Sequence, residues 1–190
     1  MKKQQISFIA LALMTLVACQ PPAAKEEKAE APAIESPDYA AFNKKVEVIR
    51  SFIKAHENED LNAQGEVMAD TLLWSPPFYN GNEWLGKEDY LAILKTYQEN
   101  FDNIKFAEGI SMGDGLLNGM WAGSVFPESE ASSEANAIRV YGTWTATNSE
   151  TGKEHGFKWY AIAWINDDGK LAQFTEYFDL GGIANQIAAE

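Results

Sequence analysis

The sequence predicts an α+β fold in which helices come first and strands follow. Apolar residues recur at helical spacing only in the first half of the region after residue 37, whereas the second half consists of short β-rich segments separated by glycine and aspartate turns. This order differs from the alternation of strands and helices that is typical of parallel α/β sheets. About 150 residues remain after position 37, which is enough for one domain and too few to expect two.

Three helices are predicted in the first half. The first, over about 38–57, carries an apolar stripe at helical spacing made of Phe42, Val46, Ile49 and Ile53. Asp60 stands at an N-cap position, so a shorter helix is expected to run from there to Met68. A third helix is marked by Tyr90, Leu91, Leu94, Tyr97, Gln98 and Phe101.

The strands are predicted from turn signals and from alternating polarity. The run 71–74 is strand-like and stops at Pro76, because proline cannot continue a hydrogen-bonded ladder. Between residues 138 and 147, small or apolar side chains alternate with polar ones, as expected for a strand with one buried face. The stretch 127–136, rich in glutamate and serine, is expected to be a long solvated hairpin loop or a lid. The predicted β-rich segments lie near 104–112, 116–126, 137–148, 156–166 and 170–179.

The N-terminus has the order of an export signal. Two lysines precede an uncharged apolar stretch over 6–18, which is shorter than the roughly 20 residues that span a bilayer. The segment Leu16-Val17-Ala18-Cys19 resembles the lipobox of bacterial lipoproteins. That resemblance implies a signal peptide over 1–18 and a lipid on Cys19, although an ordinary signal peptide with an incidental cysteine is the alternative. By the sorting rule of such lipoproteins, Gln20 favours the periplasmic side of the outer membrane, within the cell envelope.

Composition divides the rest of the chain and excludes several kinds of site. Residues 20–37, almost wholly proline, alanine, glutamate and lysine, are expected to form a disordered tether, so the domain would cover 38–190. The formal net charge of −13 argues against nucleic acid as a partner. His56 and His155 have no suitably spaced cysteine or carboxylate companions, so no metal site is expected. Without a glycine-rich phosphate loop, no cofactor is expected either.

The C-terminal motif indicates a family. The run 164–179, with sequence WINDDGKLAQFTEYFD, ends in two aromatic residues and an aspartate before a short helix with Ile183 and Ile187. Together with the order of elements, it resembles the nuclear transport factor 2-like superfamily, and its SnoaL-like members especially. The resemblance covers roughly residues 42–187. It implies a cone, in which a curved antiparallel or mixed sheet wraps against three helices and encloses a pocket open at one end.

Catalytic residues known in this superfamily are only partly matched. The aspartate base of ketosteroid isomerases, which stands just before a proline, corresponds to Ser75. A neutral hydroxyl cannot abstract a proton from carbon unaided, which argues against that activity. In limonene epoxide hydrolases the acid of the last strand corresponds to Glu176, but its arginine and aspartate partners correspond roughly to Gly142 and Trp144. The superfamily also contains members without catalysis, so the fold alone does not give a function.

Three residues are candidates for acid–base chemistry. Glu176 shares a strand face with Phe174 and Phe178, so its carboxyl is expected to be desolvated and its pKa raised. Tyr97 and His56 are the assisting candidates. For Glu176, a hydrogen-bonded structural acid is the alternative, and for His56 it is an imidazolium at the end of the first helix. His155 is expected at the surface of a hairpin turn.

Aromatic side chains are expected either to line the pocket or to form the core. The pocket candidates on elements that line the cone in the family are Trp74, Tyr79, Trp84, Trp144 and Trp159, with Tyr97. The opposite sheet face is one through which many relatives dimerise, and a homodimer is therefore a further prediction. That face would carry Tyr141, Thr143, Thr145, Tyr160 and Tyr177.

Three functions follow as hypotheses. The first is a membrane-anchored lipoprotein that binds a small apolar or neutral ligand. The second is a cofactor-independent lyase, isomerase or hydrolase that uses Glu176 as general acid or base. The third is a structural module of an envelope complex. A pocket with Glu176 buried at its floor would favour the enzyme, and a cone filled by its own tryptophans would favour the structural module.

Overall fold

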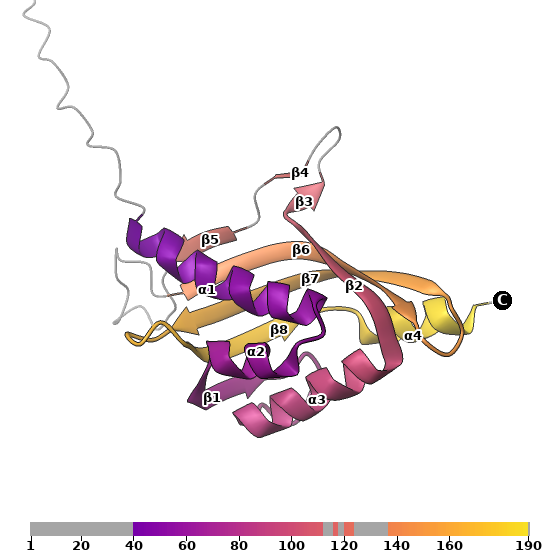
Figure 1. Cartoon of the computed structure of the whole chain (residues 1–190), viewed down its shortest axis with the longest axis horizontal. Helices are drawn as coiled ribbons and strands as arrows, with labels where there is room; N and C mark the ends of the chain where they lie inside the picture. Colours follow the sequence, from indigo (N-terminus) through magenta and orange to yellow (C-terminus); the bar gives the residue numbers. More distant parts are fainter. Residues whose placement is uncertain (1–39, 112–115, 118–119, 124–136, 190) are drawn as a thin grey trace, which may run out of the picture. The chain divides into compact units, whose positions relative to one another are not determined.

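The computed structural model describes residues 40–111, 116–117, 120–123 and 137–189 (Figure 1). The predictions for the signal peptide, for Cys19, for the tether and for the loop 127–136 lie outside the described residues. Four helices are described: α1 (Ala40–Glu57), α2 (Leu61–Val67), α3 (Lys87–Asn100) and α4 (Leu180–Ala188). The described strands are β1 (Met68–Ser75), β2 (Phe101–Glu108), β3 (Ile110–Ser111), β4 (Leu116–Leu117), β5 (Met120–Gly123), β6 (Ala137–Asn148), β7 (Glu154–Ile165) and β8 (Leu171–Tyr177).

The main sheet is mixed and has six strands: five follow the order β1-β8-β7-β6-β2, and the sixth, β5, also pairs with β6. β1 pairs with β8 in parallel, and the other pairs are antiparallel. β6 is long enough to pair with two strands along one edge, β2 over residues 142–148 and β5 over residues 137–140. The predicted α+β class and the mixed sheet packed on helices are confirmed.

Local sequence explains where the helices begin. Asp60 caps α2 as predicted, because its Oδ1 accepts a hydrogen bond from the backbone N–H of Ala63 at 2.9 Å. α3 begins earlier than its apolar stripe suggested, at Lys87. There the Asp89 carboxylate accepts from the N–H of Gly86 at 3.1 Å and places negative charge in the first turn, which favours the helix dipole.

The core lies between the sheet and helices α1 and α3, and α1 runs across the sheet in Figure 1. The predicted alternation along β6 is confirmed: Ile138, Val140, Trp144 and Ala146 are buried, whereas Arg139 and Tyr141 are only partly so. The ring of Tyr90 in α3 packs at a tilt against Trp74, at 4.6 Å between ring centroids, and against Phe174, at 5.6 Å. Burying one such aromatic ring stabilises a fold by about 1.5–3 kcal/mol.

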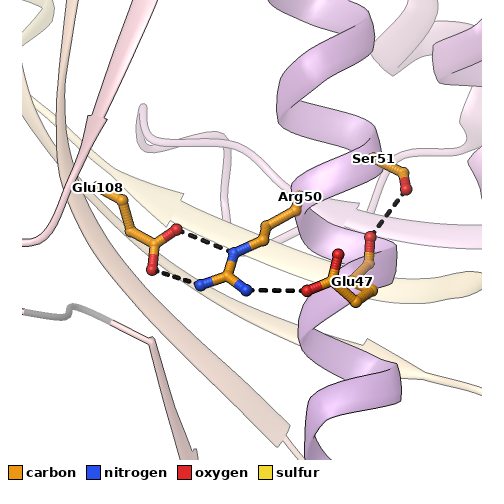
Figure 2. A network of polar contacts seen from close by, with 4 residues as sticks. All are labelled: Glu47, Arg50, Ser51 and Glu108. Atoms are coloured by element: carbon orange, nitrogen blue, oxygen red, sulfur yellow. Dashed lines mark hydrogen bonds and ion pairs between the residues drawn. The ribbon is translucent and has the colours of Figure 1, made fainter.

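Polar contacts fix α1 against β2. Arg50 donates two hydrogen bonds to the Glu108 carboxylate, at 3.1 and 2.9 Å, and a third to Glu47 at 2.8 Å (Figure 2). The Glu57 carboxylate, at the end of α1, accepts from the backbone N–H of Phe106 at 3.0 Å. Because Arg50 is half exposed, these ion pairs contribute at most about 1 kcal/mol each, and their main effect is to set the position of the helix.

Gly142 lies where β6 is covered by the Phe106 ring. A Cβ at this position would overlap that ring and lie 2.8 Å from the backbone oxygen of Ala107. The absence of a side chain at residue 142 is therefore what lets Phe106 pack across the sheet against Trp144, at 4.6 Å between ring centroids.

Replacing Gly142 by alanine is expected to destabilise the domain by about 1–3 kcal/mol, because the new methyl group forces the Phe106 ring or the backbone of β2 to shift. Urea unfolding measures the effect. The same Gly142→Ala change is expected to cost less stability when Phe106 has already been replaced by leucine, because the leucine side chain leaves more room for the new methyl group. An alanine variant as stable as wild type would show that the ring does not occupy this space.

None of the described helices is long and apolar enough to cross a membrane.

Candidate acid–base site

Glu176 is buried near the end of β8, and both of its carboxylate oxygens accept an indole N–H. Trp74 Nε1 donates to Oε1 at 3.2 Å, and Trp159 Nε1 donates to Oε2 at 2.7 Å. The strand order explains this arrangement, because β8 lies between β1, which carries Trp74, and β7, which carries Trp159 (Figure 1). Each neighbouring strand therefore supplies one donor.

Burial sets the protonation of Glu176. Desolvation raises the pKa of its carboxyl from 4.5 to about 7, although the hydrogen bonds from Trp159 and Trp74 act in the opposite direction. Near neutral pH, Glu176 is thus able both to accept and to give up a proton. The burial and the direction of the pKa shift agree with the expectation for a carboxylate among aromatic residues, whereas a catalytic role stays a prediction.

A cavity of about 80 Å³ adjoins Glu176. It is smaller than the several hundred Å³ typical of drug-sized ligands but holds more than a single water molecule. Among the described residues that line it there is no lysine or arginine, and the groups that hydrogen-bond the carboxylate are the two indoles. The cavity is lined by Phe52, His56, Tyr90, Ile93, Leu94, Tyr97, Trp144, Phe157, Trp159, Glu176 and Phe178.

A larger depression of about 1070 Å³ lies over α2 and β1. It is a surface groove with mixed polar and apolar walls, and none of the predicted site residues lines it. The small cavity is the better candidate because a buried ionisable group and apolar walls meet there, and a ligand in it would be largely removed from water.

All three predicted acid–base residues, Glu176, Tyr97 and His56, line this one cavity. The expectation of a charged His56 at the end of α1 is wrong. The imidazole is buried edge-on to Trp144, at 5.1 Å between ring centroids, and desolvation lowers its pKa from 6.5 to about 4. Its Nδ1 lies 3.3 Å from Gln98 Nε2, which also donates to Gln64 Oε1 at 2.7 Å.

The expectation of a surface position for His155 is also wrong. β7 begins at Glu154, so His155 lies within the strand instead of the turn, and it is buried. Its Nε2 is 3.1 Å from the Tyr97 hydroxyl. Burial lowers the pKa of His155, and burial raises the pKa of Tyr97 well above its ordinary value, so both groups are neutral near pH 7.

The structure divides the predicted aromatic residues into two groups. Trp144 and Trp159 line the cavity, and Trp74 is buried beside Glu176. Tyr79 and Trp84, which are 85% and 44% exposed, lie outside the cavity. Their loop leaves β1 at two consecutive prolines and runs at the surface, returning only at Leu85, whose backbone pairs with that of Trp74.

The cavity also has walls that were not predicted, chiefly Phe52, Tyr90, Leu94, Phe157 and Phe178. The spacing of Tyr90, Leu94 and Tyr97 places them on one face of α3, which is a signal that the sequence contained. Which end of that face borders a cavity, rather than solid core, depends on how the sheet curves. Periodicity does not reveal that curvature.

The catalytic sets of the two templates remain incomplete in the folded chain. Trp144 contributes a ring to the cavity wall, and the Phe106 ring fills the space beside Gly142. Of the carboxylates in the described part of the chain, Glu176 alone lines the cavity. No group of three His, Cys, Asp or Glu residues suited to a metal ion occurs in the described ranges.

The outer sheet face carries a row of stacked tyrosines. Tyr141 and Tyr160 lie 4.6 Å apart between ring centroids, and Tyr160 and Tyr177 lie 6.0 Å apart. Tyr177 is 58% exposed. The homodimer expected through this face stays a prediction.

No protein-family model matches the chain, and no curated protein matches it in sequence. Solved structures do resemble it. An LEH-like epoxide hydrolase from M. tuberculosis is 13% identical with a TM-score of 0.52, over 76% of this chain and 90% of that one. A proposed isomerase from Bacillus subtilis is 15% identical with a TM-score of 0.59, over 78% and 96%. A proposed SnoaL-like polyketide cyclase from Jannaschia sp. CCS1 is 12% identical with a TM-score of 0.57, over 78% and 94%.

Sequence identities this low show the fold alone. The element order and the mixed sheet on helices agree with these structures, as the C-terminal motif suggested. The described part of the chain thus has the α+β fold of SnoaL-like and nuclear transport factor 2-like proteins.

Proposed function

We propose that this domain binds a small, largely apolar molecule in the cavity and that Glu176 transfers a proton to or from it. The reaction would be that of a cofactor-independent lyase, isomerase or hydrolase. The observation that carries the proposal is a buried carboxyl that lines a mostly apolar cavity and accepts two indole hydrogen bonds, and whose pKa burial raises to about 7. A general acid or base is most effective when its pKa lies near the working pH.

The surroundings of Glu176 support this role. The two indole donors stabilise its anionic form but carry no charge. A lysine or arginine partner would instead neutralise the carboxylate and lower its pKa. Tyr97 and His56 line the same cavity and are neutral near pH 7, so either is suited to hydrogen-bond a polar group of the ligand. Proteins described as an epoxide hydrolase, an isomerase and a polyketide cyclase have the same fold, which is compatible with acid–base chemistry.

Binding without turnover is the second candidate. It is favoured by the incomplete template sets, because the described residues that line the cavity include a single carboxylate and no arginine. The third hypothesis, a purely structural module, is disfavoured by the cavity itself, which the tryptophans do not fill.

Exchange of Glu176 for glutamine tests the proposal. Substrates are sought by incubating wild-type protein with small epoxides, enones and hydroxy-ketones and following isomerised, hydrated or dehydrated products. For a substrate so found, Glu176→Gln is expected to lower kcat at least about 100-fold, because glutamine keeps the shape but cannot exchange a proton. The control is Glu88→Gln, which removes one charge from the first turn of α3, outside the cavity. Unchanged turnover in the Glu176 variant would refute the catalytic role.

We also propose that the domain works in the cell envelope, held at the periplasmic side of the outer membrane by a lipid on Cys19 and a tether over 20–37. The support is the apolar stretch 6–18, the segment that ends in Cys19 and the proline- and alanine-rich composition that follows. A lipid with several acyl chains would make the attachment effectively permanent, since each buried methylene contributes about 0.8 kcal/mol.

Replacing Cys19 by serine is expected to move the protein from the membrane fraction to the soluble periplasmic fraction. Cell fractionation with detection of the domain measures the shift, and mass spectrometry of the wild-type N-terminal peptide should show an acylated cysteine. An unmodified wild-type cysteine, or a serine variant that stays with the membrane, would contradict the anchor.

A further inference from the structure

Tyr97 and His155 form a partly buried pair beside the cavity, and the proposed function does not yet assign a role to His155. Tyr97 lines the cavity, and its hydroxyl oxygen lies 3.1 Å from Nε2 of His155. His155 is 3% exposed, and the rings of Phe101 and Phe157 lie 4.6 and 6.2 Å from it between centroids. The other ring nitrogen, Nδ1, is buried and has no hydrogen-bond partner within the described part of the chain.

The unpartnered Nδ1 decides where the histidine proton lies. Burial lowers the pKa of His155 below its ordinary value, which favours the neutral ring near neutral pH. In the tautomer protonated at Nδ1, a buried N–H would have no acceptor. Buried N–H groups without a partner are rarer in proteins, and cost more, than buried acceptor atoms without one. In the tautomer protonated at Nε2, the N–H donates to the Tyr97 oxygen and only a bare lone pair is left without a partner.

We propose that His155 donates its Nε2–H to the Tyr97 oxygen and so directs the Tyr97 hydroxyl proton into the cavity, where it binds an acceptor oxygen of the ligand. Tyr97 then contacts the ligand, and His155 is a positioning residue behind it. The hydrogen bond from His155 polarises the phenol and so strengthens the hydrogen bond that the Tyr97 hydroxyl donates to the ligand oxygen.

This assignment names the chemistry of the ligand and rests on the proposed function. The described lining of the cavity has two neutral groups that can donate a hydrogen bond, Tyr97 and His56, together with one carboxyl at Glu176 and mostly aromatic walls. A ligand that suits this lining has a small hydrocarbon frame and one carbonyl or ether oxygen. A cation could not accept the hydrogen bond from Tyr97, and an anion would be repelled by the Glu176 carboxylate.

The first test is the tautomer itself. In the full chain labelled with ¹⁵N histidine, His155 at pH 7 is expected to show a protonated Nε2 and an unprotonated Nδ1. His56, buried in the same domain, serves as an internal reference for a neutral ring. An Nδ1-protonated or doubly protonated His155 would overturn the proposal.

The second test uses two probes of equal shape, acetone and isobutene, which are small enough for a cavity of about 80 Å³ and differ in a carbonyl oxygen. Tyr97→Phe is expected to weaken acetone binding up to about tenfold and to leave isobutene binding unchanged. The ¹³C resonance of the bound carbonyl should move downfield in wild type and return in the variant. His155→Phe, which suits its aromatic surroundings, should give an intermediate carbonyl shift without loss of folding.

The outcomes separate this proposal from the catalytic one. If neither probe binds wild type, or if Tyr97→Phe weakens both equally, the ligand assignment is wrong. Ketone binding that depends on Tyr97 in wild type and also in Glu176→Gln would uphold it, even if no turnover is ever found.

Discussion

Glu176→Gln is expected to gain stability relative to wild type as the pH rises from 4.5 to 8. Unfolding lowers the pKa of Glu176 from about 7 to 4.5. Below pH 4.5 the carboxyl is neutral in both states and burial costs nothing extra. Between pH 4.5 and 7 the carboxyl of the unfolded wild type ionises while the buried carboxyl keeps its proton, so the wild type loses stability over this range and the loss levels off above pH 7. The difference in unfolding free energy should therefore shift by about 3 kcal/mol in favour of the variant.

Urea denaturation of both proteins at pH 4.5 and pH 8 measures this shift. The glutamine amide also brings an N–H₂ group against one of the indole donors, but that cost is the same at both pH values. His56 acts in the opposite direction, since its depressed pKa of about 4 costs stability as the pH falls below 6.5. Because His56 is present in both proteins, its contribution cancels. If the unfolding free energies of wild type and variant changed in parallel with pH, Glu176 would not be a buried carboxyl with a pKa near 7.

Trp159→Phe is expected to raise the pKa of Glu176 from about 7 to between about 8 and 9, because a hydrogen bond to a charged group contributes about 1.5–3 kcal/mol. The lost bond is the 2.7 Å donation from Nε1 to Oε2. Trp74→Phe, which removes the longer 3.2 Å bond, should raise the pKa less. A ¹³C titration of the glutamate side chain measures both effects.

The matched control for this pair is Trp144→Phe. Trp144 lines the same cavity, but its indole is not hydrogen-bonded to Glu176. Its replacement should change the shape of the cavity and leave the titration of Glu176 close to that of wild type. If all three phenylalanine variants raised the pKa equally, general loosening of the cavity, rather than loss of the indole donors, would be the cause.

Much of the fold is predictable from local signals. The N-cap at Asp60 follows from side-chain chemistry, and the end of β1 from the prolines at 76 and 77. The buried face of β6 follows from its alternation of side chains. Each of these features depends on residues close together in the chain, which is why periodicity and capping rules suffice for them.

The rest depends on contacts between distant segments. Nothing near Gly142 in sequence indicates that the Phe106 ring covers it, and nothing near Trp74 indicates that its N–H reaches Glu176. A shift of two residues in the start of β7 carries His155 from an expected turn into the core. The loop after β1 carries Tyr79 and Trp84 away from the cavity, although their residue types fit a binding site.

The pKa of Glu176 in the wild-type protein is the most direct test of the proposed acid–base site. With selective ¹³C labelling of glutamate and assignment through Glu176→Gln, the side-chain carboxyl should titrate with a midpoint near 7. That result would identify a buried group able to exchange a proton at neutral pH. A midpoint near 4.5 would mean that water or an unrecognised cation reaches the carboxylate, and the proposed site would not exist as described.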